Sequence, residues 1–349
     1  MKRCSACGVP RKITSTHRWL DNGTMVETNN PDHRMIFIES DNIGGVFTRI
    51  EEILGLPIEH LVIESQRRMT YDYVRSLMPS MVLKLFRMTS IRPLAKSVTE
   101  LGRLVGLGDV ELLSMRIKGD EGDYVKLGGR NLFYIPAYCG MVVGSMEALS
   151  GQECSISYEE TSPGYYEVTT SVTTHPVELK ERFKPREYSR KEGDLRLPRC
   201  SRCGGPSALA GYDFLYDEGI ILHRANARRM LFDGPAEFEA IFSELEKELG
   251  EDIPQVIIEA QKLFVKSGFY DLGEIMDTDA FREHLALRGL GNLRDMEYGE
   301  DHLRLRIENP CLHLLLAGLA QGVFELASDR EARVAWELAG DGDLTVEAS

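Results

Sequence analysis

The 349-residue sequence lacks any apolar run that approaches the roughly 18 residues of a membrane-spanning helix. Its first residues, MKRC, lack the apolar core of a secretory signal, so we expect a cytoplasmic protein. Positive charge is also scarce, because 41 Lys and Arg face 55 Asp and Glu, which gives a net charge of −14. Nucleic-acid surfaces need clustered cations, and this balance argues against DNA or RNA as a partner.

Catalytic motifs are missing as well. There is no glycine-rich phosphate loop, no HExxH pair and no nucleophile elbow. The eight histidines do not cluster but are spread singly along the chain. The sequence therefore gives little support to an enzyme.

The sequence does contain one motif that occurs twice. Residues 4–10 read CSACGVP, and residues 200–206 read CSRCGGP, at an offset of 196. Matches continue downstream at slightly smaller offsets, and they pair Arg34-Met35 with Arg229-Met230, Phe47 with Phe242, Gly106-x-Gly108 with Gly289-x-Gly291, Asn131 with Asn309, Gly140 with Gly318, Gly144 with Gly322, and Glu147 with Glu325. The pattern indicates a tandem duplication in which each copy opens with CxxC.

Hydrophobic periodicity and turn residues predict an α+β fold in each copy: a CxxC β-ribbon followed by helices packed on an antiparallel sheet. We expect a first copy at 1–174, a charged linker at 175–197 and a second copy at 198–349. In the first copy, the expected sheet strands and the last helix are 109–117, 123–127, 131–149 (helix), 152–160 and 165–172. In the second copy they are 292–298, 302–307, 309–327 (helix), 331–338 and 343–347.

The later two-thirds of each copy resembles the 4-vinyl reductase family of predicted hydrocarbon-binding domains. The residues that carry the resemblance in the first copy are Gly106-Leu107-Gly108, Asn131, Gly140 with Gly144, and Tyr158-Glu159-Glu160 before Gly164. The resemblance implies helices on an antiparallel sheet with an apolar pocket between them. It also implies a family zinc signature, Glu-x-x-Cys, but Ser162 and Gly340 stand where that cysteine would be.

The two CxxC pairs are the stronger candidate for a metal site. Structural zinc takes four tetrahedral ligands, and one knuckle supplies only two thiolates. We expect Cys4, Cys7, Cys200 and Cys203 to form one shared four-thiolate site, with zinc as the default and iron as a chemical alternative. Two separate sites completed by histidines, and a redox dithiol, are the other interpretations. The remaining cysteines (139, 154 and 311) are expected to be small buried apolar residues.

The helix over 131–149 carries the candidate ligand contacts. Gly140 and Gly144 lie four residues apart, so they permit either close packing of another helix or the approach of a flat ligand. Under the ligand hypothesis the site comprises Tyr134, Tyr138, Gly140, Met141, Gly144 and Glu159. In the second copy Leu312 and Leu316 replace the two tyrosines, so the first copy is expected to be the binding-competent one.

Together these features predict a zinc-containing protein that binds an apolar small molecule, hydrocarbon, aromatic or lipid-like, as a sensor, carrier or accessory subunit. A signal would pass to a separate protein partner, because no DNA-binding or ATPase segment is recognisable. The alternative is an enzyme or enzyme subunit that acts on a vinyl or aromatic group with an unidentified redox cofactor. A third interpretation is a scaffold whose pockets are filled by side chains.

Overall fold

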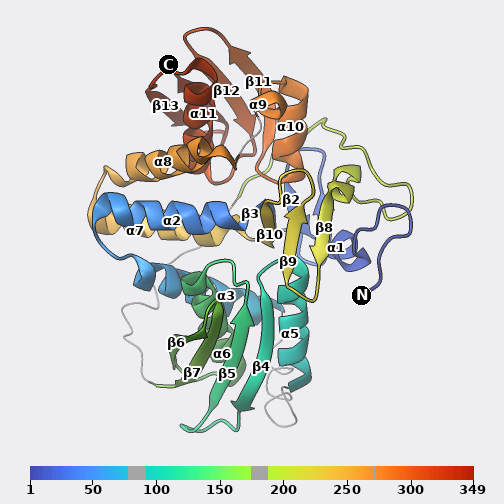
Figure 1. Cartoon of the computed structure of the whole chain (residues 1–349), viewed down its shortest axis with the longest axis vertical. Helices are drawn as coiled ribbons and strands as arrows, with labels where there is room; N and C mark the ends of the chain where they lie inside the picture. Colours follow the sequence, from blue (N-terminus) through green and yellow to red (C-terminus); the bar gives the residue numbers. More distant parts are fainter. Residues whose placement is uncertain (78–91, 174–187, 270–271) are drawn as a thin grey trace. The chain divides into compact units, whose positions relative to one another are not determined.

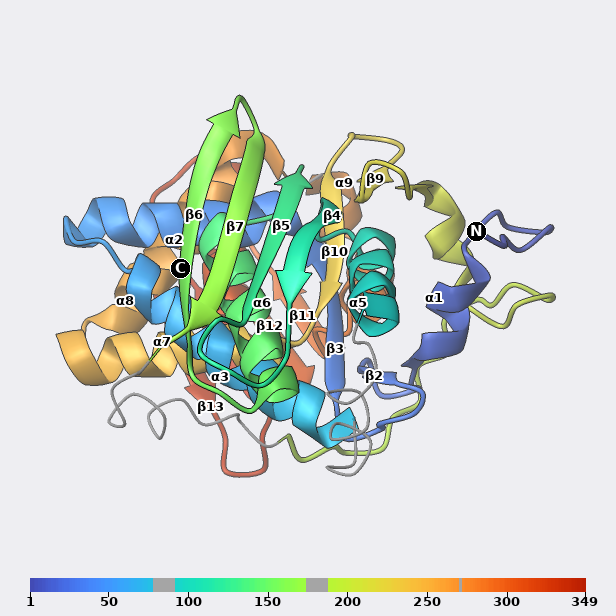
Figure 2. The same ribbon diagram turned by 90° about the horizontal axis from the view of Figure 1, so that it is seen from below.

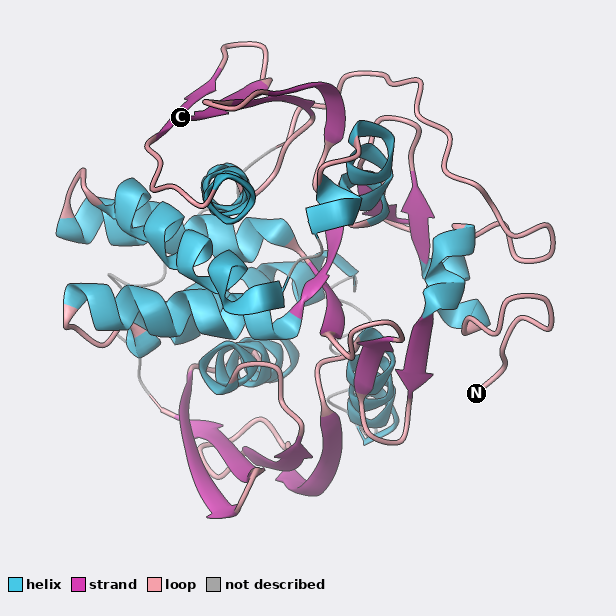
Figure 3. Cartoon of the chain, turned by 45° about the horizontal axis from the view of Figure 1, so that its top comes forward, coloured by secondary structure: helices cyan, strands magenta, loops and turns pink. Residues whose placement is uncertain are grey.

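The computed structural model describes residues 1–77, 92–173, 188–269 and 272–349. Helices and antiparallel sheets are combined in these residues, which makes the fold α+β as expected (Figure 3). Contacts divide the chain into two compact units. The first comprises Met1–Leu56, Arg186–Asp213 and Leu222–Ser349, and the second comprises Pro57–Pro185 and Phe214–Ile221.

A six-stranded sheet combines strands from both halves of the sequence, in the order β1-β2-β3-β10-β9-β8. Its strands are β1 (His17–Trp19), β2 (Met25–Glu27), β3 (Arg34–Glu39), β8 (Tyr212–Leu215), β9 (Ile220–His223) and β10 (Arg229–Asp233). The central pair, β3 and β10, is antiparallel and joins equivalent strands of the two halves. Every residue of β3 is buried, and Phe37 stacks on Phe232 with ring centroids 4.3 Å apart.

Two long helices follow the central strands and also come from equivalent positions in the sequence. Helix α2 (Ser40–Leu54) ends at Gly55, which has the positive φ of 65° that favours glycine. Helix α7 (Pro235–Leu249) begins with a proline in its first turn, a position where the missing amide hydrogen of proline costs nothing. The two helices run side by side (Figure 1) and touch through the equivalent rings of Phe47 and Phe242, 5.9 Å apart.

The rest of the first unit is built on a four-stranded sheet in the order β11-β12-β14-β13. Its elements are α8 (Ile253–Phe264), α9 (Leu272–Ile275), α10 (Thr278–Leu287), β11 (Asn292–Tyr298), β12 (Leu303–Glu308), α11 (His313–Ser328), β13 (Val334–Leu338) and β14 (Leu344–Ala348). Helix α11 is apolar on nearly every side and packs on both α8 and β14. The strands and last helix predicted for the second copy are confirmed.

The second unit contains a sheet of the same type, in the order β4-β5-β7-β6 (Figure 2). Its elements are α3 (Glu59–Leu77), α5 (Arg92–Val105), β4 (Asp109–Arg116), β5 (Tyr124–Arg130), α6 (Ile135–Ser150), β6 (Cys154–Ser162) and β7 (Tyr165–Val172). Helix α6 packs against β6 and β7 on one side and against α3 on the other. The strands and the last helix predicted for the first copy are confirmed here too.

The compact units do not coincide with the sequence repeats, because each glycine turn of the opening ribbon docks on a GxG turn from the other half. Gly23 accepts a hydrogen bond from the Gly291 amide at 3.2 Å, within the first unit. In the second unit, Gly219 accepts one from the Gly108 amide at 3.0 Å. A Cβ atom at Gly23 or Gly219 would collide with the backbone of its partner turn, so both contacts require glycine.

Residues 175–187 of the expected linker lie outside the described residues. In the described part of that segment Leu195 and Leu197 are buried, and the Tyr188 hydroxyl donates to Glu239 at 2.8 Å. Two short helices, α1 (Arg11–Thr16) and the 3-10 turn Ser207–Gly211, interrupt the expected ribbons. None of the helices in the described residues is long and apolar enough to cross a membrane.

Candidate metal centre

Each CxxC sequence folds into a tight loop whose shape is fixed by backbone hydrogen bonds. In the first loop the Cys4 amide donates to Val9 and the Gly8 amide donates to Cys4, both at 2.8 Å. Equivalent bonds of 2.9 Å close the second loop, from Cys200 to Gly205 and from Gly204 to Cys200. The glycine after each second cysteine has a positive φ, 76° at Gly8 and 73° at Gly204, a conformation that other residues adopt only with strain.

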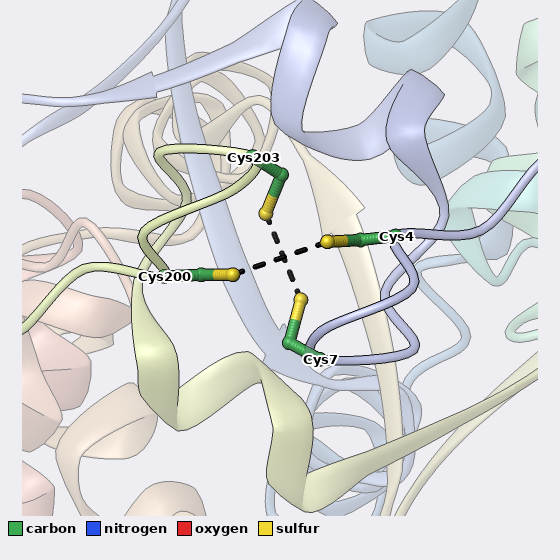
Figure 4. Close-up of side chains that lie close together, drawn as sticks. All are labelled: Cys4, Cys7, Cys200 and Cys203. Atoms are coloured by element: carbon green, nitrogen blue, oxygen red, sulfur yellow. Dashed lines mark hydrogen bonds between the residues drawn. The ribbon is translucent and has the colours of Figure 1, made fainter.

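These loops bring all four predicted cysteines together inside the first compact unit (Figure 4). The Sγ atoms of Cys4 and Cys200 are 3.9 Å apart, and those of Cys7 and Cys203 are 3.6 Å apart. All four sulfurs lie within 4.8 Å of one another. A tetrahedral ion with metal–sulfur bonds of about 2.3 Å would set its sulfurs about 3.8 Å apart, so the cluster has the dimensions of a four-thiolate site.

The loops also favour the thiolate form of their first cysteines, and thiolates are the form that binds a metal. Backbone amides of Ala6 and Cys7 hydrogen-bond to the Cys4 sulfur and lower its pKa to about 6. The amides of Cys203 and Arg202 lower the pKa of Cys200 in the same way. Burial raises the pKa of Cys7 to about 12, so a bound cation is needed to hold that thiol deprotonated.

Arginines at equivalent positions brace both loops. Arg3 donates from Nη1 to the Gly8 carbonyl and Arg199 from Nη1 to the Gly204 carbonyl, each at 3.1 Å. A divalent ion held by four thiolates carries two net negative charges, and guanidinium groups nearby reduce the cost of that charge. The arginine that directly precedes the first cysteine therefore makes the same contact in both loops.

Histidines do not complete separate sites with these cysteines. The ring of His17 packs 4.6 Å from that of Phe232, and its Nδ1 lies 3.1 Å from the Ile13 carbonyl oxygen. Burial lowers the pKa of His17 to about 4. Nδ1 of His223 is engaged with Asn226 at 2.9 Å. In the described residues the metal-ligand cluster consists of the four cysteines alone.

The three remaining cysteines are buried, as expected. Burial raises the pKa of Cys139 to about 12 and that of Cys154 to about 11, so both are protonated and unreactive at neutral pH. Cys311 is fully buried as well. These residues act as small apolar side chains.

The candidate ligand contacts lie on or beside α6 in the second unit, and its glycine face is covered by α3. A Cβ at Gly140 would lie 2.5 Å from Cβ of Gln66, and one at Gly144 would collide with the Arg67 carbonyl oxygen. The glycines are therefore a close helix–helix contact, which is one of the two roles that the sequence left open.

The other ligand candidates differ widely in exposure. Tyr138 is buried and its pKa is raised by that burial, whereas Tyr134 and Met141 are half-buried. Glu159 is exposed on β6, opposite Glu167 of β7. Ligand binding at these positions stays a prediction.

A repeated carboxylate clamp was not foreseen from the sequence. In the second unit, Glu147 of α6 accepts from the Arg67 guanidinium of α3, at 2.9 Å from Nε, and from the Cys154 amide at 2.9 Å. In the first unit, Glu325 of α11 accepts from the Lys266 ammonium and the Ala332 amide. The sequence repeat does match Glu147 with Glu325, which indicates that this position matters in both halves. The match alone does not show which cation and which backbone amide each carboxylate binds.

Comparisons with known proteins place the chain in no family: no family model matches it, and neither does any curated protein. Among solved structures, it is similar to the phenol-responsive sensory domain of the transcription activator PoxR with phenol. That match has 14% identity and a TM-score of 0.33, and it covers 42% of this chain and 80% of that one. A second is a Cs H-NOX mutant, with 13% identity, a TM-score of 0.26 and coverage of 35% and 76%.

A third match is an oxygen-binding H-NOX domain related to soluble guanylate cyclases, with 14% identity, a TM-score of 0.22, and coverage of 32% and 68%. All three TM-scores are far below the values found between proteins of the same fold, so we draw no conclusion about this chain from these matches. The resemblance to 4-vinyl reductase domains rests on the sequence pattern alone.

Proposed function

We propose that the four cysteines hold one structural zinc ion. The observation that carries this proposal is the spacing of the four sulfurs, within 4.8 Å of one another on two loops 196 residues apart in the sequence. Four protein ligands complete a tetrahedral shell and leave no position open for substrate or water, which is the arrangement of structural rather than catalytic zinc. The ion would tie the opening loops of the two duplicated halves together.

The molecule that the zinc stabilises is, in our proposal, a duplicated binding protein for an apolar small molecule. It would act as a sensor, carrier or accessory subunit in the cytoplasm, where the four thiols would stay reduced. Support comes from the sequence pattern shared with predicted hydrocarbon-binding domains and from the two four-stranded sheets of identical strand order. In the second unit, contacts to a ligand would fall to Tyr134, Tyr138, Met141 and Glu159, since α3 covers Gly140 and Gly144.

Native mass spectrometry of the full chain, purified without chelator, tests both parts of the proposal. We expect one zinc ion and an organic molecule of low polarity to be released on denaturation. Metal with no organic mass would favour the scaffold interpretation. A flavin, haem or other redox cofactor would instead support an enzyme.

A further inference from the structure

The positive charge of the chain is concentrated around the two cysteine loops. Residues 1–20 and 195–212 carry these loops, lie in the first compact unit and contain no Asp or Glu. All 55 acidic residues therefore lie elsewhere in the chain. We call the two segments together the basic lobe. The first segment supplies five cations, Lys2, Arg3, Arg11, Lys12 and Arg18, and the second supplies three, Arg196, Arg199 and Arg202.

All eight of these residues are exposed. Arg3 and Arg199 brace the loops through carbonyl oxygens. Among the described residues, none of the other six forms an ion pair. Exposed cations elsewhere in the first unit do have carboxylate partners, as Arg49 has in Glu52 and Arg224 in Asp213. The charge of the basic lobe is therefore available to a partner from outside the chain.

The fold brings the cations of both segments to one region of the surface. The two loops project side by side next to α1 (Figure 2), and they meet at the four clustered sulfurs. An ion held by four thiolates adds two net negative charges, which is fewer than the eight cations of the lobe. The lobe therefore stays strongly positive with the metal bound, within a chain whose net charge is −14.

From this segregation of charge we propose that the basic lobe binds the phosphate backbone of double-stranded DNA without reading its sequence. A polyanion responds to the local field of a surface, so the distribution of cations matters more than the net charge of the whole chain. The expectation from the sequence, that the chain avoids nucleic acid, considered only the total charge. This inference adds a second binding activity and does not rest on the proposed small-molecule ligand.

The composition of the lobe favours nucleic acid over an acidic protein. Protein interfaces have an apolar core, often with aromatic side chains. The structure describes every residue of the lobe, and the only large apolar side chain exposed there is that of Met1. Exposed serines lie among the cations, at Ser5, Ser15, Ser201 and Ser207. Arginine, lysine and serine side chains are groups that commonly contact phosphates.

The same composition favours a duplex over a single strand. Proteins that bind single strands stack the bases on exposed aromatic rings. The lobe's Trp19 and Tyr212 are 2% and 8% exposed, so neither ring is available for stacking. Helix α1 has six residues, which offers less than two turns to a groove. The contacts that we expect are therefore to phosphates alone, which makes them independent of sequence and dependent on salt.

The experiment measures the binding of a fluorescein-labelled DNA duplex of about 20 base pairs to the full, zinc-loaded chain by fluorescence anisotropy. We expect saturable binding at about 50 mM salt, and a logarithmic salt dependence with a slope of about −0.9 for each phosphate contacted. Three contacts would weaken binding about 40-fold between about 50 mM and about 200 mM salt. Duplexes of unrelated sequence should bind equally well.

Two double variants with the same change of total charge separate the lobe from the rest of the surface. Arg11→Gln with Lys12→Gln removes two cations of the lobe. It should weaken binding about 10-fold at about 50 mM salt, with a slope shallower by about 1.8. Arg49→Gln with Arg304→Gln removes two exposed cations outside the lobe and should leave the affinity unchanged. Zinc content equal to that of the wild type shows that the lobe of each variant is folded.

Arg18→Gln with Arg196→Gln changes the lobe at other exposed positions and carries the same expectation as the first double variant. The proposal is overturned by an absence of saturable binding, by equal weakening in the lobe variants and the control variant, or by tighter binding of the single strand than of the duplex. Polyglutamate of matched charge that competes as well as unlabelled duplex would assign the lobe to an acidic protein partner, and this result also overturns the proposal. None of these results bears on the small-molecule ligand, which native mass spectrometry tests separately.

Discussion

The Sγ atoms of Cys7 and Cys203 lie 3.6 Å apart, although the two residues are 196 positions apart in the sequence. That distance is too long for a disulfide, whose sulfurs are about 2.05 Å apart, and it suits neighbouring ligands of one tetrahedral ion. The cysteines of one loop alone would supply half of such a site. The relationship makes the two halves of the duplication interdependent.

The first prediction concerns the contact between α6 and α3. In Gly144→Ala the new Cβ would meet the Arg67 backbone, which cannot rotate away, so we expect the free energy of unfolding to fall by about 1–3 kcal/mol or more. Gly102→Ala on α5 is the control, because its Cβ would lie 3.8 Å from Leu107 and the helix gains up to about 1 kcal/mol. Urea unfolding measures both. Equal stability of the two variants would show that α3 does not cover this face.

The carboxylate clamp gives a second prediction. Glu147→Ala would leave the guanidinium of Arg67, 8% exposed, buried without its main partner, and we expect a loss of about 3–5 kcal/mol. Glu100→Ala removes an exposed pair with Lys96 in the same unit and should cost less than about 0.5 kcal/mol. Similar losses from the two substitutions in urea unfolding would contradict the clamp.

A third prediction follows from two buried carboxyl groups at the start of α7. Burial raises the pKa of Asp233 to about 7, and burial together with the charge of Asp233 raises that of Glu237 to about 8. Unfolded carboxyls titrate near pH 4, so between about pH 4 and 8 these two groups bind more protons in the folded chain than in the unfolded chain. The stability that these two groups contribute therefore falls as the pH rises through this window, by about 1.4 kcal/mol per unit of pKa difference.

The double variant Asp233→Asn, Glu237→Gln removes both titrations. Urea unfolding at about pH 5.5 and about pH 8.5 should show a smaller loss of stability in the variant than in the wild type. Asp32→Asn, at a carboxylate 98% exposed, should leave the wild-type difference unchanged. A variant as pH-dependent as the wild type would mean that neither carboxyl is held protonated in the fold.

Much of the architecture could be predicted from local sequence signals. The apolar periodicity of α7, with Pro235 at its start and Gly250 after its end, and the alternation of apolar and charged residues in β12 indicated elements that the structure shows. The cluster of four cysteines could be predicted because each CxxC pair supplies two of the four ligands of a structural zinc site, and the chain contains two such pairs. The short helix α1 was missed because its six residues bury only Ile13 and carry no periodic signal.

The exchange of glycine turns could not be predicted from the sequence. The repeat shows that Gly23 corresponds to Gly219 and Gly108 to Gly291, so each ribbon turn has two nearly equivalent surfaces available. A ribbon turn could form the same backbone hydrogen bond with the GxG turn of its own half or with that of the other half. Which of the two forms depends on the three-dimensional path of the whole chain. The burial of Gln66 and Gln261 could not be predicted either, because polar residues on a helix ordinarily face solvent.

The shared zinc ion is the centre of this account, and metal content measured by mass spectrometry of the purified chain tests it most directly. We predict one zinc per chain in the wild type, and an equally complete loss in Cys4→Ser and in Cys200→Ser, because either substitution breaks the same four-ligand shell. Cys139→Ala, at a buried thiol of the second unit that is not one of the four clustered cysteines, should keep its zinc. A chelator should lower the melting temperature of the wild type, since the binding energy of a structural metal is also folding energy. Two zinc ions per chain, or full retention of zinc in either serine variant, would contradict the shared site.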